Sequence, residues 1–395
     1  MTVGQSGSPV GVAVIGLGGA VATTAVAGVE QLKLGTSGPD GLPLAHRDDL
    51  VPYESLVFGG WDLNADDLAK AAHVHRVLEP AQIEAVSRQL ECIEPWAAVV
   101  DPAYCRNVVG ANVVAVEPLR ERVAQVRADL RRFREEQQLE TVVVVNLAST
   151  EAWPDRTSAI FADINTFEKG LDVDDPVITP GMIYAYAAIT EGCPFVNFTP
   201  SLGSDVPALL MLAERERVPV AGKDGKTGQT LIKTVLAPAF RSRALKVDGW
   251  YSTNILGNRD GQILDDPSSL ASKLGTKGSV LDSILGYDVD DHVVRIDYYR
   301  PRGDAKEAWD NIDLIGFLGQ RMQLKVDFLC RDSILAAPLV LELVRLVAEA
   351  KRRGEGGAQE QLGFFFKAPT TKDGRVPEHA LHAQERALFD WLDSR

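Results

Sequence analysis

The first half of the chain alternates short apolar runs with amphipathic segments. Val10–Ile15 is a β-branched run that predicts a buried strand, and 20–31 continues with helix formers. Leu56–Phe58 predicts a second strand that ends at a glycine pair, and TVVVVNL at 141–147 predicts a third. Between them, 117–138 repeats apolar residues at spacings of four and three, which predicts a two-sided helix of about six turns. Such alternation is typical of a parallel sheet covered by helices.

The pattern changes after residue 222. PFVNF at 194–198 predicts one more strand of the first kind, followed by a helix. Beyond it, 250–254 and VVRIDYY at 293–299 predict strands of a separate, more antiparallel region. Helical periodicity returns over 338–351. The chain therefore contains two regions of different architecture.

Composition and charge exclude several classes of partner. The chain has 395 residues, of which 45% are hydrophobic and 24% charged, enough for one large or two medium domains. Because 55 acidic residues oppose 41 basic ones, for a net charge of -14, we expect no nucleic acid and no membrane surface as partner. No apolar run is long enough to span a bilayer. The four cysteines are scattered without a CxxC pair, which favours a reducing cytoplasm.

A glycine cluster follows the first predicted strand. In GLGGAVATT, Gly16, Gly18 and Gly19 lie where a strand passes into a helix, a position suited to binding the pyrophosphate of a dinucleotide. The turn departs from the usual GxGxxG pattern, because Val21 stands at the third glycine position. The acidic residue expected about 20 residues later is also missing, and Asp62 comes only after a long loop. A tight turn that binds nothing remains the alternative.

Residues 222–277 collect glycine, lysine, threonine and asparagine in the loops GKDGKTGQT, STNILGNRDG and SKLGTKG. Backbone N–H groups, hydroxyls and ammonium groups are what a phosphate requires. The glycine spacing does not fit a Walker loop. In an acidic protein such a cationic stretch predicts a small anionic ligand, with polar surface turns as the alternative.

Four lysines are candidates for a site. Lys273 and Lys277 are four apart, so on a helix they would share a face and would need an anion between them. Lys306 lies in RPRGDAK. Lys367 follows three phenylalanines on a predicted buried strand, where its ammonium needs a partner and desolvation lowers its pKa. Solvated or snorkelling lysines are the alternative.

Two carboxylates could form ion pairs with these lysines. Asp260 and Asp332 are candidate partners for the ammonium groups or ligands for a hard cation, and ordinary surface carboxylates otherwise. The histidines do not form a recognisable metal-binding pattern.

Taken together, the chain resembles the myo-inositol-phosphate synthases of the shorter archaeal and bacterial type, over nearly its whole length. The resemblance rests on a series of blocks in the family's order: VIGLGGAVATT, VFGGWDLN, VVVNLAST, PFVNFTPS, GKDGKTGQT, STNILGNRDG, SKLGTK, RPRGDAK, CRDSILAAPL and FFFKAP.

This resemblance implies a fold and an assembly. The expected fold is α/β, with a discontinuous Rossmann-type NAD-binding domain made of 1–222 and 333–395. An inserted α+β domain over 223–332 would carry catalytic residues and form a homotetramer.

The resemblance also implies a reaction. The enzyme would use NAD to convert D-glucose 6-phosphate to 1D-myo-inositol 3-phosphate, for inositol and phospholipid biosynthesis. The steps would be oxidation at C5, enolisation at C6, an aldol reaction joining C6 to C1, and reduction at C5. The alternatives are another NAD-dependent sugar-phosphate cyclase or epimerase, and a non-catalytic NAD-binding regulator.

Roles for individual residues come from the family pattern. Lys277 and Lys306 would hold the phosphate, Lys273 would serve as acid and base at the C5 oxygen, and Lys367 would stabilise the oxygen at C1. The catalytic set is Lys273, Lys277, Lys306, Lys367, Asp332 and Asp260. The substrate-binding set is Asp224, Lys226, Thr227, Gly228, Gln229 and Asn254. The cofactor-binding set is Gly16, Gly18, Gly19, Ala20, Val21, Asp62, Asn64, Ala148, Ser149 and Asp205. A divalent cation near Asp260 or Asp332 is left open.

Overall fold

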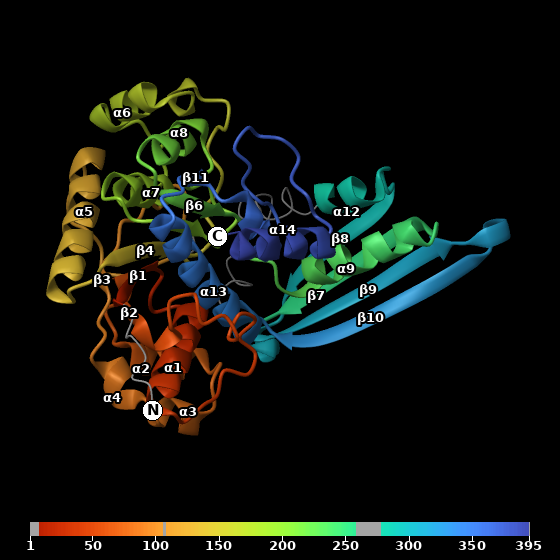
Figure 1. Ribbon diagram of the computed structural model, residues 1–395, viewed down its shortest axis with the longest axis horizontal. Coiled ribbons are helices and arrows are strands. Elements are labelled where there is room, and N and C mark those ends of the chain that lie inside the picture. Colours follow the sequence, from red (N-terminus) through yellow and green to blue (C-terminus); the bar gives the residue numbers. More distant parts are fainter. Residues whose placement is uncertain (1–7, 106–107, 258–277, 395) are drawn as a thin grey trace.

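The computed structural model describes residues 8–105, 108–257 and 278–394. Its larger sheet has seven parallel strands in the order β11-β6-β5-β4-β1-β2-β3 (Figure 1). The strands are β1 (Val10–Ile15), β2 (Leu56–Asp62), β3 (Trp96–Ala97), β4 (Thr141–Asn146), β5 (Phe195–Asn197), β6 (Pro219–Gly222) and β11 (Gly357–Ala358). The parallel sheet predicted from the alternating pattern is confirmed.

Helices cover both faces of this sheet. All six residues of β1 are buried, because its alternate side chains enter two different cores. One core packs β1 against α1 (Ala20–Leu34) and α13 (Asp332–Arg352), and the other packs it against α5 (Leu119–Glu136) and α7 (Pro180–Thr190). The other helices of this region are α2 (Leu68–His75), α3 (Pro80–Glu84), α4 (Ser87–Glu91), α6 (Ile164–Asp172), α8 (Pro207–Arg215) and α14 (Leu381–Asp393).

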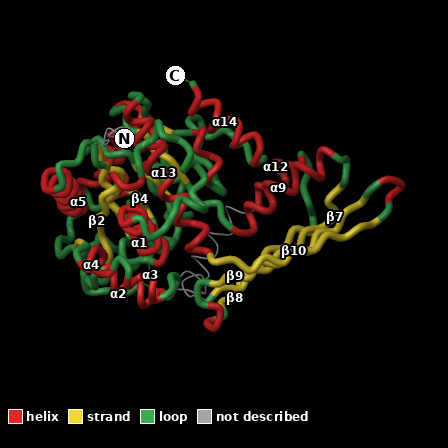
Figure 2. Tube along the Cα trace, turned by 60° about the horizontal axis from the view of Figure 1, so that its bottom comes forward, coloured by secondary structure: helices red, strands yellow, loops and turns green. Residues whose placement is uncertain are grey.

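The smaller sheet extends away from the rest as a long arm (Figures 1 and 2). Its strands, in the order β10-β9-β7-β8, are β7 (Lys246–Leu256), β8 (Asp291–Tyr298), β9 (Ala305–Ile315) and β10 (Arg321–Arg331). The separate sheet is confirmed, but it is mixed, because β8 runs parallel to β7 while β9 is antiparallel to both β7 and β10. Helices α9 (Gly228–Ser242) and α12 (Gly278–Leu285) cover one of its faces.

Three sequence predictions change in detail. The strand that was expected to end at Phe58 continues through Gly59 and Gly60 to Asp62. Helix α13 begins at Asp332, six residues before the predicted start, and contains Pro338 within its length. The prediction that Lys367 lies on a strand is wrong, because a 3-10 helix, Glu360–Phe365, precedes it and only an isolated bridge occurs nearby, at Phe366.

The segment that joins the two sheets pairs with a distant part of the chain. Residues 222–225, between β6 and α9, exchange backbone hydrogen bonds with 366–370. Lys223 and Ala368 bond to each other in both directions, and the Lys367 N–H donates to the Asp224 carbonyl at 2.7 Å. The two segments therefore lie side by side.

Within the described residues, no helix is long and apolar enough to cross a membrane.

Candidate active site

The glycine turn lies at the carboxyl end of β1, where parallel α/β sheets bind ligands. Gly16 has φ +86°, and a Cβ there would come within 3.1 Å of the Ala148 backbone, so only glycine fits without strain. Gly19 is the N-cap of α1, which places Ala20 and Val21 in the first turn of the helix. Val21 packs against the core, so an apolar side chain fills the third glycine position.

An acidic residue does lie beside this turn. Asp62 is the last residue of β2, next to β1, and its Oδ2 accepts the Gly18 N–H at 2.9 Å. Its Oδ1 accepts the Asn64 N–H at 2.9 Å. The long spacing between the glycine turn and Asp62 comes from the loop over 35–52, inserted between α1 and β2. No acid follows at the usual spacing, but Asp62, a predicted cofactor residue, ends the strand next to the turn.

Two further groups lie at the carboxyl ends of β4 to β6. Asp205, expected at the cofactor, forms an ion pair with Lys223 at 2.5 Å, and the Lys223 ammonium lies 5.3 Å from the centre of the Trp153 ring. Ser149 is half-buried in the loop after β4. In the same loop the buried Glu151 accepts the Gly181 N–H at 2.9 Å, and desolvation raises the pKa of its carboxyl to about 7.

Sequence reasoning missed both Lys223 and Glu151. Lys223 belongs to the GKDGKTGQT block and could have been included on composition. Glu151 carries no signal of spacing or composition, because its burial depends on how the loop packs against α7.

The N-termini of two helices meet at the phosphate-binding candidates. The Thr227 hydroxyl donates to Asp332 Oδ1 at 3.0 Å, and Lys306 Nζ lies 3.4 Å from the same oxygen. Asp332 is the first residue of α13, and Gly228 is the first of α9. Gly228 has φ +43°, and a Cβ there would lie 3.4 Å from the Lys306 ammonium. Helix N-termini attract anions, so this cluster is suited to a phosphate.

Lys367 has the partner that its burial requires. Its Nζ lies 2.8 Å from Asp224 Oδ1, and the two side chains are only 9% and 4% exposed. The prediction that this ammonium needs a partner is confirmed, and that partner is Asp224, from the GKDGKTGQT block. Asp332 instead contacts Lys306.

The remaining substrate-binding candidates are used within the protein. Gln229 Nε2 donates to the backbone carbonyls of Thr253 and Trp309 at 3.0 and 3.2 Å, while its Oε1 accepts from Asn254. These contacts tie the first turn of α9 to β7 and β9. The Lys226 ammonium donates to Gln384 of α14.

Three candidates, Lys273, Lys277 and Asp260, lie outside the described residues, and their roles stay predictions. Within the described part of the chain, no group of three or more His, Cys, Asp or Glu residues could hold a metal ion.

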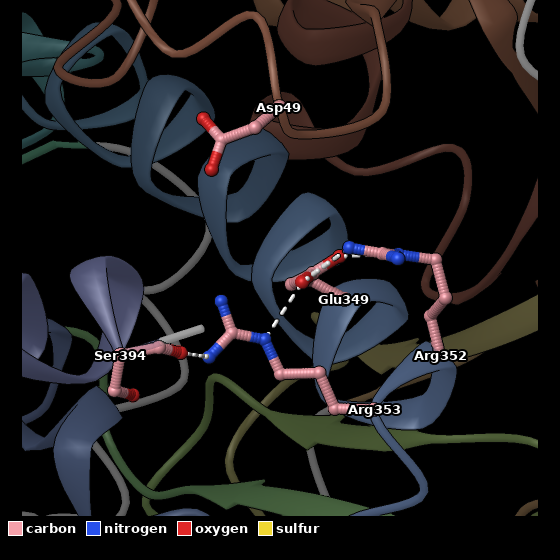
Figure 3. Close-up of a pocket in the computed structure, with 5 residues that line it drawn as sticks. All are labelled: Asp49, Glu349, Arg352, Arg353 and Ser394. Atoms are coloured by element: carbon pink, nitrogen blue, oxygen red, sulfur yellow. Dashed lines mark hydrogen bonds and ion pairs between the residues drawn. The ribbon is translucent and has the colours of Figure 1, made fainter.

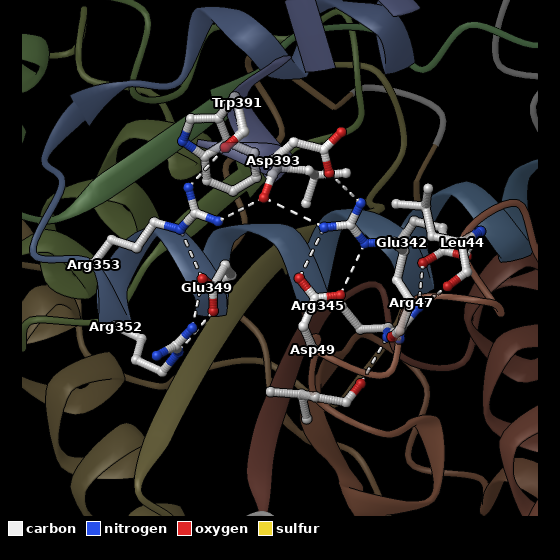
Figure 4. A network of polar contacts seen from close by, with 12 residues as sticks. Leu44, Arg47, Asp49, Glu342, Arg345, Glu349, Arg352, Arg353, Trp391 and Asp393 are labelled. Carbon is white, nitrogen blue, oxygen red and sulfur yellow. Dashed lines mark hydrogen bonds and ion pairs between the residues drawn. The ribbon is translucent and has the colours of Figure 1, made fainter. Parts of the chain in front are cut away.

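A cavity of about 600 Å³ lies elsewhere, lined by Asp49, Glu349, Arg352, Arg353 and Ser394 (Figure 3). Glu349 is near the C-terminal end of α13, roughly 25 Å along the helix from Asp332 at 1.5 Å per residue. The two guanidinium groups that line this cavity are already engaged by Glu349 and by backbone carbonyls of α14 (Figure 4). The cluster at the N-terminal end of α13 therefore remains the candidate active site.

Comparison with known proteins identifies the family of this chain. The sequence profile of the family described as Myo-inositol-1-phosphate synthase, an NAD-binding family, matches residues 41–393. The chain belongs to the myo-inositol-1-phosphate synthase family. Inositol-3-phosphate synthase 1 of Bacteroides thetaiotaomicron is 42% identical over 97% of this chain and 94% of its own length. Inositol-3-phosphate synthase of Saccharomyces cerevisiae is 29% identical over 97% and 84%.

Solved structures of the myo-inositol-1-phosphate synthase family match the whole fold. The crystal structure of inositol-3-phosphate synthase from Caenorhabditis elegans superposes with a TM-score of 0.90 at 27% identity, covering 98% of this chain and 85% of that one. A synthase-related protein from Thermotoga maritima gives 0.80 at 26% identity, covering 97% and 98%. Both sheets of this chain therefore belong to the family's architecture.

Proposed function

We propose that this protein is an inositol-3-phosphate synthase that converts D-glucose 6-phosphate to 1D-myo-inositol 3-phosphate with NAD. Its family and the names of its relatives support this activity. The observation that carries it is the meeting of Lys306, Asp332 and Thr227 at the starts of α9 and α13. The segment 224–228 connects this cluster directly to the buried Lys367–Asp224 pair.

The turn after β1 fits NAD. The close approach of Gly16 to Ala148 leaves a backbone-lined cradle at the start of α1, suited to a pyrophosphate. The Asp62 carboxylate lies beside Gly18. In Rossmann-type folds an acidic residue in this position binds the ribose hydroxyls. Bound NAD would supply the hydride acceptor at the start of the reaction and the hydride donor at its end, so there is no net redox change. Asn64, Ser149 and Asp205 complete the proposed cofactor set.

Lys306 would hold the substrate phosphate together with the first turn of α9. Its ammonium and the Thr227 hydroxyl both contact Asp332 Oδ1, and Gly228, the first residue of α9, lies beside the Lys306 ammonium. A sugar phosphate anchored there keeps its reacting carbons at a fixed distance from the other lysines. Lys277 is proposed as a second phosphate ligand.

Lys367 would stabilise the negative charge that develops on the C1 oxygen when C6 attacks C1. The Asp224 carboxylate lies 2.8 Å from this buried ammonium and fixes its position, so that its charge would act on the substrate in a site of low dielectric constant. Lys273 would remove the proton of the C5 hydroxyl during oxidation and return it during reduction. Asp260 and Asp332 would orient the ammonium groups.

Phosphorus NMR of the reaction product tests the proposal. We expect glucose 6-phosphate with a catalytic amount of NAD to give inositol phosphate, and no product without NAD. A different sugar phosphate as product would favour another cyclase or epimerase. No conversion by a protein that binds NAD would favour a non-catalytic regulator. Repeating the assay with a chelator, then with added Mg²⁺ or Zn²⁺, decides whether a divalent cation takes part.

We further propose a homotetramer that associates through the smaller sheet. The face opposite α9 and α12 carries apolar side chains that are partly exposed, among them Tyr251 at 37%, Val293 at 37% and Leu329 at 60%. Tyr251 also makes an edge contact with Trp309, at 6.0 Å between ring centres. Burial against a second copy would remove this surface from water. Tyr251→Asp should lower the mass measured by light scattering from four chains to fewer, and an unchanged mass would contradict the proposal.

A cytoplasmic location is also proposed. All four cysteines are free thiols, and Cys92 is exposed, which suits a reducing compartment.

A further inference from the structure

The side chain of Lys226 contacts α14, whereas Asp224 contacts Lys367 and Thr227 contacts Asp332. Lys226 lies between Asp224 and Thr227, both proposed site residues, and like Asp224 it is 3% exposed, so its hydrogen-bond partner and not its burial distinguishes it. Its ammonium donates to the side-chain oxygen of Gln384 on α14 and lies 5.7 Å from the centre of the Phe364 ring. A lysine that bound the substrate phosphate would have to present its ammonium to the site, but this one is enclosed by the C-terminal region.

The side-chain amide of Gln384 is hydrogen-bonded at both its nitrogen and its oxygen. It is 4% exposed, and its Nε2 donates to the Glu378 carbonyl at 2.7 Å while its Oε1 accepts from Lys226. Both ends of the amide are thus used, one by the segment before α14 and one by Lys226. The Lys226 backbone N–H donates to the Phe365 carbonyl at 2.8 Å. Lys226 is therefore fastened through its main chain and through its side chain.

The electrostatic surroundings agree with a structural contact. Burial lowers the pKa of Lys226 to about 7. Burial, and secondarily the charge of Lys226, lowers the pKa of His379 to about 4, so this nearby histidine is neutral at neutral pH. The acceptor at Gln384 is a neutral amide. Lys306, in contrast, has a carboxylate partner, because its ammonium lies 3.4 Å from Asp332 Oδ1.

We propose that Lys226 is a positioning residue: through Gln384, the C-terminal helix α14 fixes the backbone that presents Asp224 and Thr227 to the substrate. Asp224 orients Lys367, and Thr227 begins the helix at the phosphate cluster. A displacement of this segment therefore alters both ends of the site at once. The kinetic consequences rest on the proposed function, whereas the mechanical link between α14 and residues 224–228 does not.

Hydrogen exchange measured by mass spectrometry tests the link without turnover. Gln384→Met keeps the volume of the side chain but removes the acceptor, so amides of 224–231 should exchange about tenfold faster. Gln384→Glu restores an acceptor in the same place and should restore protection. Lys226→Met breaks the same contact from the other side and should resemble Gln384→Met. The matched control is Glu385→Gln, an exposed neighbour on α14, which should exchange as the wild type does.

The kinetic readout separates positioning from direct binding. With Gln384→Met, the KM for glucose 6-phosphate should rise about tenfold, within the range of a misplacement near 1 Å, and NAD affinity should stay unchanged. A lower KM would mean that the freed ammonium binds the substrate, and it would overturn the proposal. Wild-type exchange over 224–231 in Gln384→Met would overturn it as well. If the wild type forms no inositol phosphate, the proposed function fails, and the exchange comparison still decides the link.

Discussion

The buried pair of Lys367 and Asp224 allows stability and chemistry to be measured separately. The two charges are 2.8 Å apart, and their side chains are 9% and 4% exposed. At an effective dielectric constant of 20, Coulomb's law gives about 6 kcal/mol of attraction, much of which offsets desolvation. Asp224→Asn leaves the ammonium without this carboxylate. We therefore expect a loss of about 3–5 kcal/mol of folding free energy.

Lys367→Met should also be destabilising, because the buried Asp224 carboxylate loses the ammonium that lies 2.8 Å away. The double variant removes both charges, so its cost should be several kcal/mol less than the sum of the two single costs. Urea unfolding, followed by circular dichroism and tryptophan fluorescence, gives the three free energies. Additive costs would refute the view that these charges act as a pair.

The three variants should differ in their effects on activity and on stability. Turnover of glucose 6-phosphate should fall by at least about 100-fold in all three variants, because the charged ammonium is what the developing oxyanion requires. NAD affinity should be unchanged, since Asp62 and the glycine turn are intact. Turnover within about tenfold of the wild type in Asp224→Asn or Lys367→Met would refute the catalytic role.

Three further outcomes are expected. Desolvation raises the pKa of Glu151 from 4.5 to about 7, so the folded state gains stability below pH 4.5 that is lost as the pH rises to 7. Glu151→Gln should remove this loss of roughly 3 kcal/mol from the pH dependence of unfolding, and an unaltered dependence would contradict the assignment. Arg345 is 2% exposed and pairs with Glu342 at 2.8 Å while holding backbone carbonyls of the loop before β2 (Figure 4). Arg345→Met should therefore lower the free energy of unfolding by about 3–5 kcal/mol. A thermal midpoint near that of the wild type would contradict this expectation. Lys306→Met should raise the KM for glucose 6-phosphate and leave NAD affinity unchanged, whereas a normal KM would remove Lys306 from the phosphate site.

Strands and helices with strong periodicity could be predicted from the sequence because their pattern is local. The run 141–147 and the amphipathic helix over 117–138 have the expected form in the structure, within one or two residues at each end. The strand at Lys367 could not be predicted correctly, because three successive phenylalanines suit a buried 3-10 turn as well as a strand. The local sequence pattern indicates that a segment is buried. Tertiary contacts decide which backbone conformation the buried segment takes.

Asp62 illustrates the same division within the site. The sequence predicted that Gly18 and Asp62 belong to one cofactor site through the family pattern, but their spacing along the chain gave no indication of the contact at 2.9 Å. Adjacency of β1 and β2 in the sheet brings them together whatever the length of the loop between them.

The sequence by itself determined the parallel α/β class, the second sheet, the family and the set of charged residues from which a site can be built. The tertiary structure decided how those residues pair. It joined Lys367 to Asp224 and Lys306 to Asp332, and it enclosed Lys226 beneath α14. Pairing depends on which segments lie side by side and on which charges are removed from water, and neither property is encoded in local spacing.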